Sequence, residues 1–172
     1  MNADVTEERR LILRLLAQWD GLRGDRPFPG IRDLEPEALG DGWDSCFVLT
    51  LAQPRAESTF QHLGRALRSP GMAGAQAGLR VADVPPATLL AQVLDCLPAL
   101  LDKRVPVSLG GERRLHDGPV LCRSVVLPLS DDGTAIDHVL GAGNCRYLAV
   151  GDAPLGHGAA DQSAGRGGGA GA

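Results

Sequence analysis

The sequence predicts an α+β domain: a five-stranded antiparallel sheet with helices on one face and an amphipathic helix at the N-terminus. Two segments, 6–22 and 89–101, carry apolar residues at helical spacing. Short segments rich in β-branched and apolar residues lie between and after them, separated by Gly, Pro and Asp turns. The predicted order is therefore helix, two strands, helical crossover, three strands.

The N-terminal segment 6–22 has one continuous apolar stripe, formed by Leu11, Ile12, Leu15, Leu16, Trp19 and Leu22. Such a stripe most often covers the core of its own domain. The alternative is that it pairs with a second copy of the chain. The candidate interaction residues, for a second copy or for another partner protein, are Leu11, Leu15, Trp19, Arg23 and Arg26.

A proline-rich hook, residues 26–36, follows this helix, and its three prolines exclude regular helix. The segments 46–52 and 58–67 then read as two strands of a hairpin with a turn at Gln53 and Pro54. A second helix follows Pro86, and Pro98 should kink it.

The last three strands are predicted at 105–115, 120–130 and 135–147, as an antiparallel meander with a tight turn at 131–133. From about residue 150 the composition collapses to Gly and Ala, which bury too little surface to offset the entropy of ordering. The predicted organisation is an N-terminal helix at 1–26, one domain at 27–150 and a disordered tail at 151–172.

Charge and composition exclude several classes of function. A net charge of −4 and a pI near 5.5 do not suit nucleic-acid binding, which needs a clustered basic face. No apolar run is long enough to span a bilayer and no signal peptide is recognisable, so we expect a cytoplasmic protein without membrane insertion. The four cysteines form no close pair, and we expect buried thiols without disulfides.

Several motifs together resemble a family of bacterial PAS domains, long catalogued as a domain of unknown function, in which a helix and a proline-rich hook precede the sheet. The matching residues cover roughly 10 to 148 of the chain. They are Trp19, Leu22, Arg23, Gly24, Arg26, Pro27, Pro29, Asp33, Leu34 and Pro36, the strand FVLTL, and the stretch LPLSDDGTAIDHVLGA from Leu127 to Ala142. The chain departs from the family at HLGRAL, residues 62–67.

The resemblance implies a PAS fold that binds small molecules or partner proteins and passes on a signal. No kinase, cyclase or DNA-binding segment is recognisable, so the expected output is contact with a signalling or motility protein, or with a second copy through the N-terminal helix. We expect a sensory or regulatory module and no enzyme.

An apolar pocket is the candidate ligand site, placed between the sheet and the crossover helix. Its predicted lining is Phe47, Leu49, Phe60, Leu90, Leu94, Val125 and Leu127. The alternative is that these side chains fill the core completely, because protein interiors pack to crystal-like density.

No cofactor, metal or catalytic residue is predicted. GNCRYL, residues 143–148, looks like the cysteine signature of flavin-binding PAS domains, yet that cysteine should lie on a helix and Cys145 is expected in the last strand. The helical stretch 69–104 lacks a histidine for haem. Asp137 and His138 are neighbours on a predicted strand and should point to opposite faces.

Two other functions stay open at this level. One is a small enzyme that uses a reactive thiol, which would be exposed and of lowered pKa. The other is a PAS scaffold without a ligand, which would have no pocket of a few hundred Å³.

Overall fold

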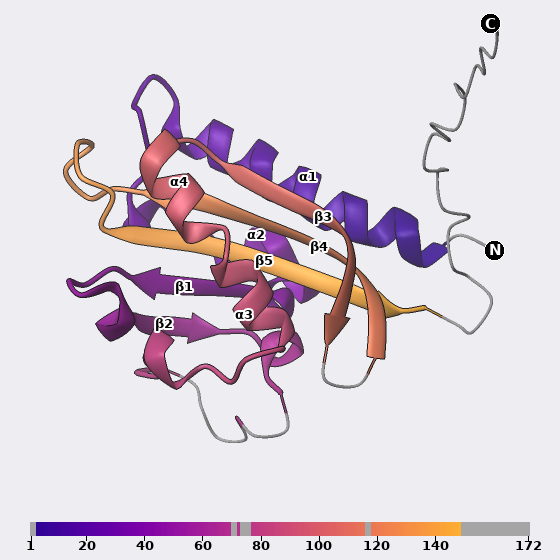
Figure 1. Cartoon of the computed structure of the whole chain (residues 1–172). Helices are drawn as coiled ribbons and strands as arrows, with labels where there is room; N and C mark the ends of the chain where they lie inside the picture. Colours follow the sequence, from indigo (N-terminus) through magenta and orange to yellow (C-terminus); the bar gives the residue numbers. More distant parts are fainter. Residues whose placement is uncertain (1–2, 70–71, 73–76, 116–117, 149–172) are drawn as a thin grey trace, which may run out of the picture.

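Five strands form one antiparallel sheet in the order β2-β1-β5-β4-β3, shown in the computed structural model of Figure 1. The structure describes residues 3–69, 72, 77–115 and 118–148. The strands are β1 Cys46–Thr50, β2 Thr59–Leu63, β3 Val107–Leu115, β4 Gly118–Leu129 and β5 His138–Tyr147. The predicted fold class is thus confirmed, whereas the tail predicted at 151–172 lies outside the described residues.

Helices cover both faces of the sheet (Figure 1). The N-terminal helix α1, Ala3–Arg23, lies on one face. The helices α3, Leu89–Leu94, and α4, Leu97–Lys103, lie on the other face. Pro98 stands in the first turn of α4, so the predicted kinked helix is in fact two helices. Among the described residues no helix is long and apolar enough to cross a bilayer.

The two faces of the sheet bury two separate apolar clusters because side chains alternate along each strand. Phe47 and Leu49 of β1 face α3 and α4, whereas Val48 between them faces α1. The stripe of α1 packs on this second face, with Leu15 fully buried. Of the two roles predicted for the stripe, cover of the domain's own core is confirmed.

Between α1 and the first strand the chain follows the hook, the short helix α2, Pro36–Leu39, and a 3-10 turn, Gly40–Ser45. The hook joins the turn between β4 and β5 by one backbone–backbone hydrogen bond and one bond to a side chain. Ser130 N donates to Pro29 O at 2.9 Å, and Ile31 N donates to Asp131 Oδ1 at 3.2 Å. The two motifs that carried the resemblance, far apart in sequence, therefore contact each other.

Trp19 anchors α1 to the same corner of the fold. Its side chain is 7% exposed, and its Nε1 donates to Pro128 O in β4 at 2.8 Å. A buried carbonyl that loses its donor costs about 1–3 kcal/mol. This bond therefore fixes the position of α1 along β4.

We expect Trp19→Phe to lower the free energy of unfolding by about 2 kcal/mol, because Pro128 O would stay buried without its donor. Urea denaturation measures the loss. The matched control is Trp43→Phe, because Trp43 is partly exposed and stacks on His62, which a phenyl ring can also do. Equal losses in the two variants would contradict the anchoring role of Trp19.

Candidate functional site

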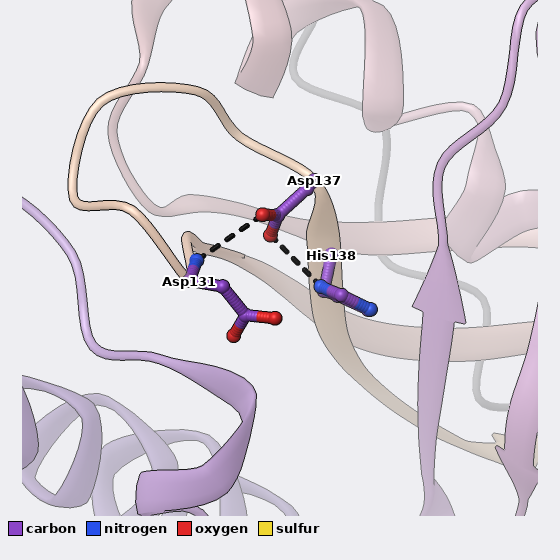
Figure 2. A group of neighbouring side chains, drawn as sticks. All are labelled: Asp131, Asp137 and His138. Carbon is purple, nitrogen blue, oxygen red and sulfur yellow. Dashed lines mark hydrogen bonds and ion pairs between the residues drawn. The ribbon is translucent and has the colours of Figure 1, made fainter.

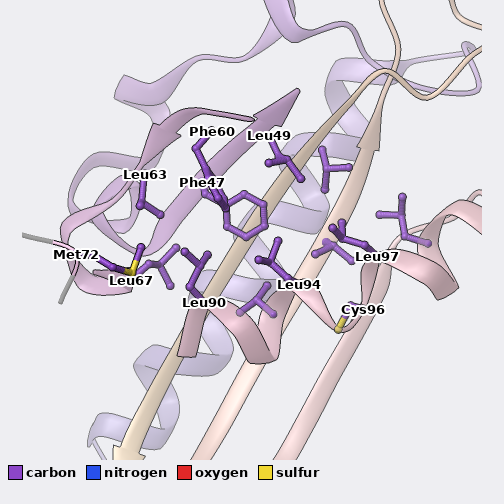
Figure 3. Close-up of a cluster of buried hydrophobic side chains, with 14 residues drawn as sticks. Phe47, Leu49, Phe60, Leu63, Leu67, Met72, Leu90, Leu94, Cys96 and Leu97 are labelled. Atoms are coloured by element: carbon purple, nitrogen blue, oxygen red, sulfur yellow. The ribbon is translucent and has the colours of Figure 1, made fainter. Parts of the chain in front are cut away.

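The predicted ligand pocket corresponds to the cluster between the sheet and α3–α4 (Figure 3). Five of its seven predicted lining residues lie together there, each no more than 9% exposed: Phe47, Leu49, Phe60, Leu90 and Leu94. The rings of Phe47 and Phe60 meet edge to face, with centroids 5.4 Å apart. The prediction thus identified the correct layer of the fold.

The other two predicted lining residues, Val125 and Leu127, were wrongly assigned. Both lie in the cluster against α1, on the opposite face of β4. Val126 faces α3 and α4, and side chains alternate along a strand, so its two neighbours must face the other way. Several consecutive residues are apolar here, so the sequence does not show which of them face the helices α3 and α4. An assignment that is displaced by one residue places every side chain on the wrong face.

Gly141 decides how much room the predicted pocket has. It pairs with Phe47 across β1 and β5, and the Phe47 ring lies directly over it. A Cβ at Gly141 would stand 2.1 Å from Phe47 Cζ, a distance that real Cβ atoms essentially never show. The phenyl ring therefore occupies the space that a side chain on β5 would take.

Gly143 has the same role two residues further along β5. A Cβ there would stand 2.6 Å from Val93 Cγ2, so α3 packs directly against the strand backbone. Both glycines lie on the face toward α3 and α4, as close packing points, which is one of the roles glycine takes inside a strand. The interior that could have held a ligand is filled at these two points by the chain's own side chains.

An open groove lies on the other side of the molecule, between α1, the segment 39–45 and the end of β5. Its volume is about 860 Å³. It is lined by Arg10, Leu11, Leu13, Arg14, Ala17, Leu39, Gly40, Asp41, Gly42, Ser45, Asn144 and Cys145. Leu13 is 64% exposed at its wall.

This groove was not predicted from the sequence. Leu13 does not belong to the apolar stripe of α1 and stands between Arg10 and Arg14, and this off-stripe leucine is the one signal that could have pointed to it. Arg14 Nη2 donates to Leu39 O at 2.9 Å and so holds α1 to the opposite wall.

The five predicted interaction residues are largely engaged within the chain. Leu11, Leu15 and Trp19 are buried on the domain's own sheet. Arg23 bonds Asp20 at 2.7 Å. Arg26 Nη2 bonds Asp33 Oδ2 at 2.7 Å, and it also donates to Leu22 O at 2.6 Å.

Asp33 holds the hook in its shape. Its Oδ2 accepts a hydrogen bond from Gly30 N at 2.8 Å in addition to the bond from Arg26. These bonds lower the pKa of the Asp33 carboxyl from its usual 3.8. The bond from Gly30 N has the larger effect, and the bond from the Arg26 guanidinium has the next largest.

Two of the four cysteines have the features of buried structural thiols. Burial raises the pKa of Cys46 to about 12, and its Sγ donates to Gly42 O. Burial also raises the pKa of Cys96, which lies 4% exposed between α3 and α4. Cys145 lies in β5, as predicted, so it is not on the helix that the flavin signature requires.

Asp137 and His138 do meet, contrary to prediction (Figure 2). Asp137 Oδ1 lies 2.8 Å from His138 Nδ1. The alternation of faces does not apply to this pair because β5 begins at His138 and Asp137 still belongs to the turn. With Asp131 they place one ligand atom each within 4.8 Å of one another.

The hydrogen bonds of this cluster account for its shape. Asp137 Oδ2 accepts from Asp131 N at 3.1 Å, and Asp131 Oδ1 accepts from Ile31 N. His138 Nε2 lies 3.4 Å from Gln61 Nε2, which donates to Thr50 Oγ1. The three side chains thus tie the β4–β5 turn to the hook and to Gln61 of β2.

No family model matches the sequence, and no curated protein matches it. The structure is similar to a light-oxygen-voltage (LOV) protein of Rhodobacter sphaeroides, with 11% identity, coverage of 80% of this chain and 67% of that chain, and a TM-score of 0.40. It is also similar to the blue-light photoreceptor Vivid, with 13% identity, coverage of 82% and 94%, and a TM-score of 0.37. A light-oxygen-voltage domain studied with a flavin analogue gives 12% identity, coverage of 64% and 83%, and a TM-score of 0.41. LOV domains are a subfamily of PAS domains, and at these values the likeness concerns overall topology alone.

We expect Gly141→Ala to lower the free energy of unfolding by about 3 kcal/mol, because the new methyl group would overlap the Phe47 ring. Urea denaturation measures the loss, and adding Phe47→Leu should recover part of it. Gly21→Ala is the matched control, since no atom lies within 4 Å of its new Cβ on helix α1. A stable Gly141→Ala variant would mean that the interior holds spare room.

Asp33 should make the stability of the hook depend on pH. Its pKa is lower in the folded chain, so its contribution is complete above 3.8 and is lost as the pH falls through the lowered folded value. The unfolding free energies of wild type and Asp33→Asn, followed from about pH 7 to pH 2, should differ by under about 1 kcal/mol at neutral pH and converge in acid. A difference that stays constant down to the acid end would contradict this role.

Proposed function

We propose that the chain is a PAS-type regulatory module that acts by binding a signalling or motility protein and encloses no small-molecule ligand. The observation that carries this proposal is the packing of Phe47 on Gly141 and of Val93 on Gly143. A cytoplasmic location and the lack of enzymatic activity, both expected from the sequence, belong to the same proposal.

The filled interior favours the ligand-free scaffold over the apolar-ligand sensor. Sites for small molecules normally offer about 300–1,000 Å³ and bury most of the ligand. To open such a space between the sheet and α3, the Phe47 ring and the Val93 methyl group would have to leave β5. Displacing well-packed side chains loses their dispersion contacts and costs free energy.

The groove beside α1 has the chemistry of a partner surface. The exposed Leu13 lies between Arg10 and Arg14 on the α1 wall, and Asp41 stands among the lining residues contributed by the segment 39–45. An apolar anchor flanked by two guanidinium groups complements an amphipathic helix that presents leucine-like and acidic side chains. We therefore commit to an acidic amphipathic helix of the partner as the occupant of this groove.

A photoreactive amino acid at Ala17, on the groove wall, should crosslink the full-length protein to its partner in cells. Leu13→Asp should abolish this crosslink and weaken binding of the purified partner about tenfold or more, because it replaces the apolar anchor by a carboxylate. Mass spectrometry identifies the crosslinked chain, and a second copy of this protein is a separate, recognisable outcome.

Two controls make the crosslinking result specific. The same photoreactive group at Ala56, in the 3-10 turn Arg55–Glu57 that follows β1 at its far end, should give no such product. Val105→Asp, a second exposed apolar position, should leave the Ala17 crosslink unchanged. Equal labelling from Ala56, or a crosslink that survives Leu13→Asp, would overturn the groove as the partner surface.

A further inference from the structure

Cys122 and Cys145 stand directly opposite each other on β4 and β5, although 22 residues separate them in the sequence. Directly opposed residues in an antiparallel pair have Cα atoms about 4.5–5.5 Å apart and side chains on the same face. A disulfide requires Cα atoms about 4.4–6.8 Å apart. The register therefore places the two Cα atoms at a separation that a disulfide can bridge.

Solvent can reach this pair at Cys145, the more exposed of the two residues. Cys122 is 6% exposed and Cys145 is partly exposed. On the other side of Cys122, the residue opposite it on β3 is Gly111, which has no side chain to cover the sulfur. A small hollow opens there and is lined by Cys122, Gly111 and Arg113, among others.

Thiol–disulfide exchange needs an attacking cysteine that a small disulfide can reach. Cys145, which is partly exposed, meets this requirement. Cys46 has the opposite setting, since it lies on the α1 face of the sheet and burial raises its pKa to about 12. The four cysteines, which could not be told apart from the sequence, therefore differ in exposure.

We propose that Cys122 and Cys145 are an oxidation site, which forms a cross-strand disulfide by exchange with a small disulfide such as oxidised glutathione. The Cys145 thiolate attacks one sulfur of the small disulfide, whose S–S bond breaks and releases one thiolate. The Cys122 thiolate then attacks Cys145 Sγ and displaces the second half. Two cysteine thiols are oxidised, one small disulfide is reduced to two thiols, and these take up the two thiol protons.

The bond would lock β4 to β5 at the end of the sheet farthest from the hook. Closing a loop between two strands restricts the unfolded chain and so stabilises the folded one. The oxidised protein should accordingly unfold at a higher urea concentration than the reduced protein, and a thiol reductant should reverse the shift.

The test treats the full, folded protein with oxidised glutathione, blocks the remaining thiols with an alkylating agent, and maps the peptides by mass spectrometry. We expect one linked pair of peptides that carry Cys122 and Cys145, with a mass loss of two hydrogen atoms. In Cys122→Ser, glutathione should remain attached to Cys145, because the second thiolate is missing. In Cys145→Ser, neither product should form.

Cys46→Ser and Cys96→Ser are the matched controls, and both should keep the linked pair because their thiols take no part. The wild-type peptide map decides the question even if one serine variant fails to fold. A wild-type protein that keeps glutathione on Cys145, that forms a link only after denaturation, or that links Cys46 or Cys96 instead would overturn the proposal.

Discussion

The packing of the Phe47 ring on Gly141 is the contact on which the filled interior between the sheet and α3–α4 depends. β5 is the central strand of the sheet, and at Gly141 and Gly143 it offers no side chain toward the helices. The Phe47 ring from β1 lies over Gly141, and Val93 of α3 lies directly on Gly143. A side chain at Gly141 would overlap the Phe47 ring, and one at Gly143 would overlap Val93, so the two glycines allow this interior to be filled.

The opposite face of the sheet follows from the same alternation of side chains. With one face filled from α3 and α4, the other is covered by α1, and Trp19 and the hook fix that helix to the corner between β4 and β5. Most of the apolar stripe of α1 is therefore buried against the domain's own sheet and is not exposed for dimerisation. It leaves outside the stripe the exposed Leu13 and its two flanking arginines, which is why we place partner binding at the groove.

Much of the fold could be predicted from periodicity and turn residues, because each element satisfies its own local rule. The order of elements and the layer that holds Phe47, Leu49, Phe60, Leu90 and Leu94 follow from such rules. The faces on which Val125 and Leu127 lie could not be predicted, because a continuous run of apolar residues does not show which of them point to which side of the sheet. The contact of Asp137 with His138 depends on where β5 begins, which strand propensity locates only to within a few residues.

The groove and the pairing of Cys122 with Cys145 depend on contacts between segments that are far apart in the sequence. The groove could not be predicted because its walls come from segments far apart in sequence, and only Leu13 marks it locally. The facing of Cys122 and Cys145 depends on the pairing of β4 with β5 residue by residue, which the spacing of cysteines in the chain does not reveal. Contacts of this kind require the three-dimensional structure.

The measurement that tests the filled interior most directly is native mass spectrometry, combined with an absorbance spectrum, on freshly purified and unheated protein. Our account predicts the mass of the bare polypeptide and no absorbance in the visible range, because Phe47 and Val93 occupy the space over β5. A stoichiometric extra mass, or a visible band from a chromophore held within the protein, would contradict it.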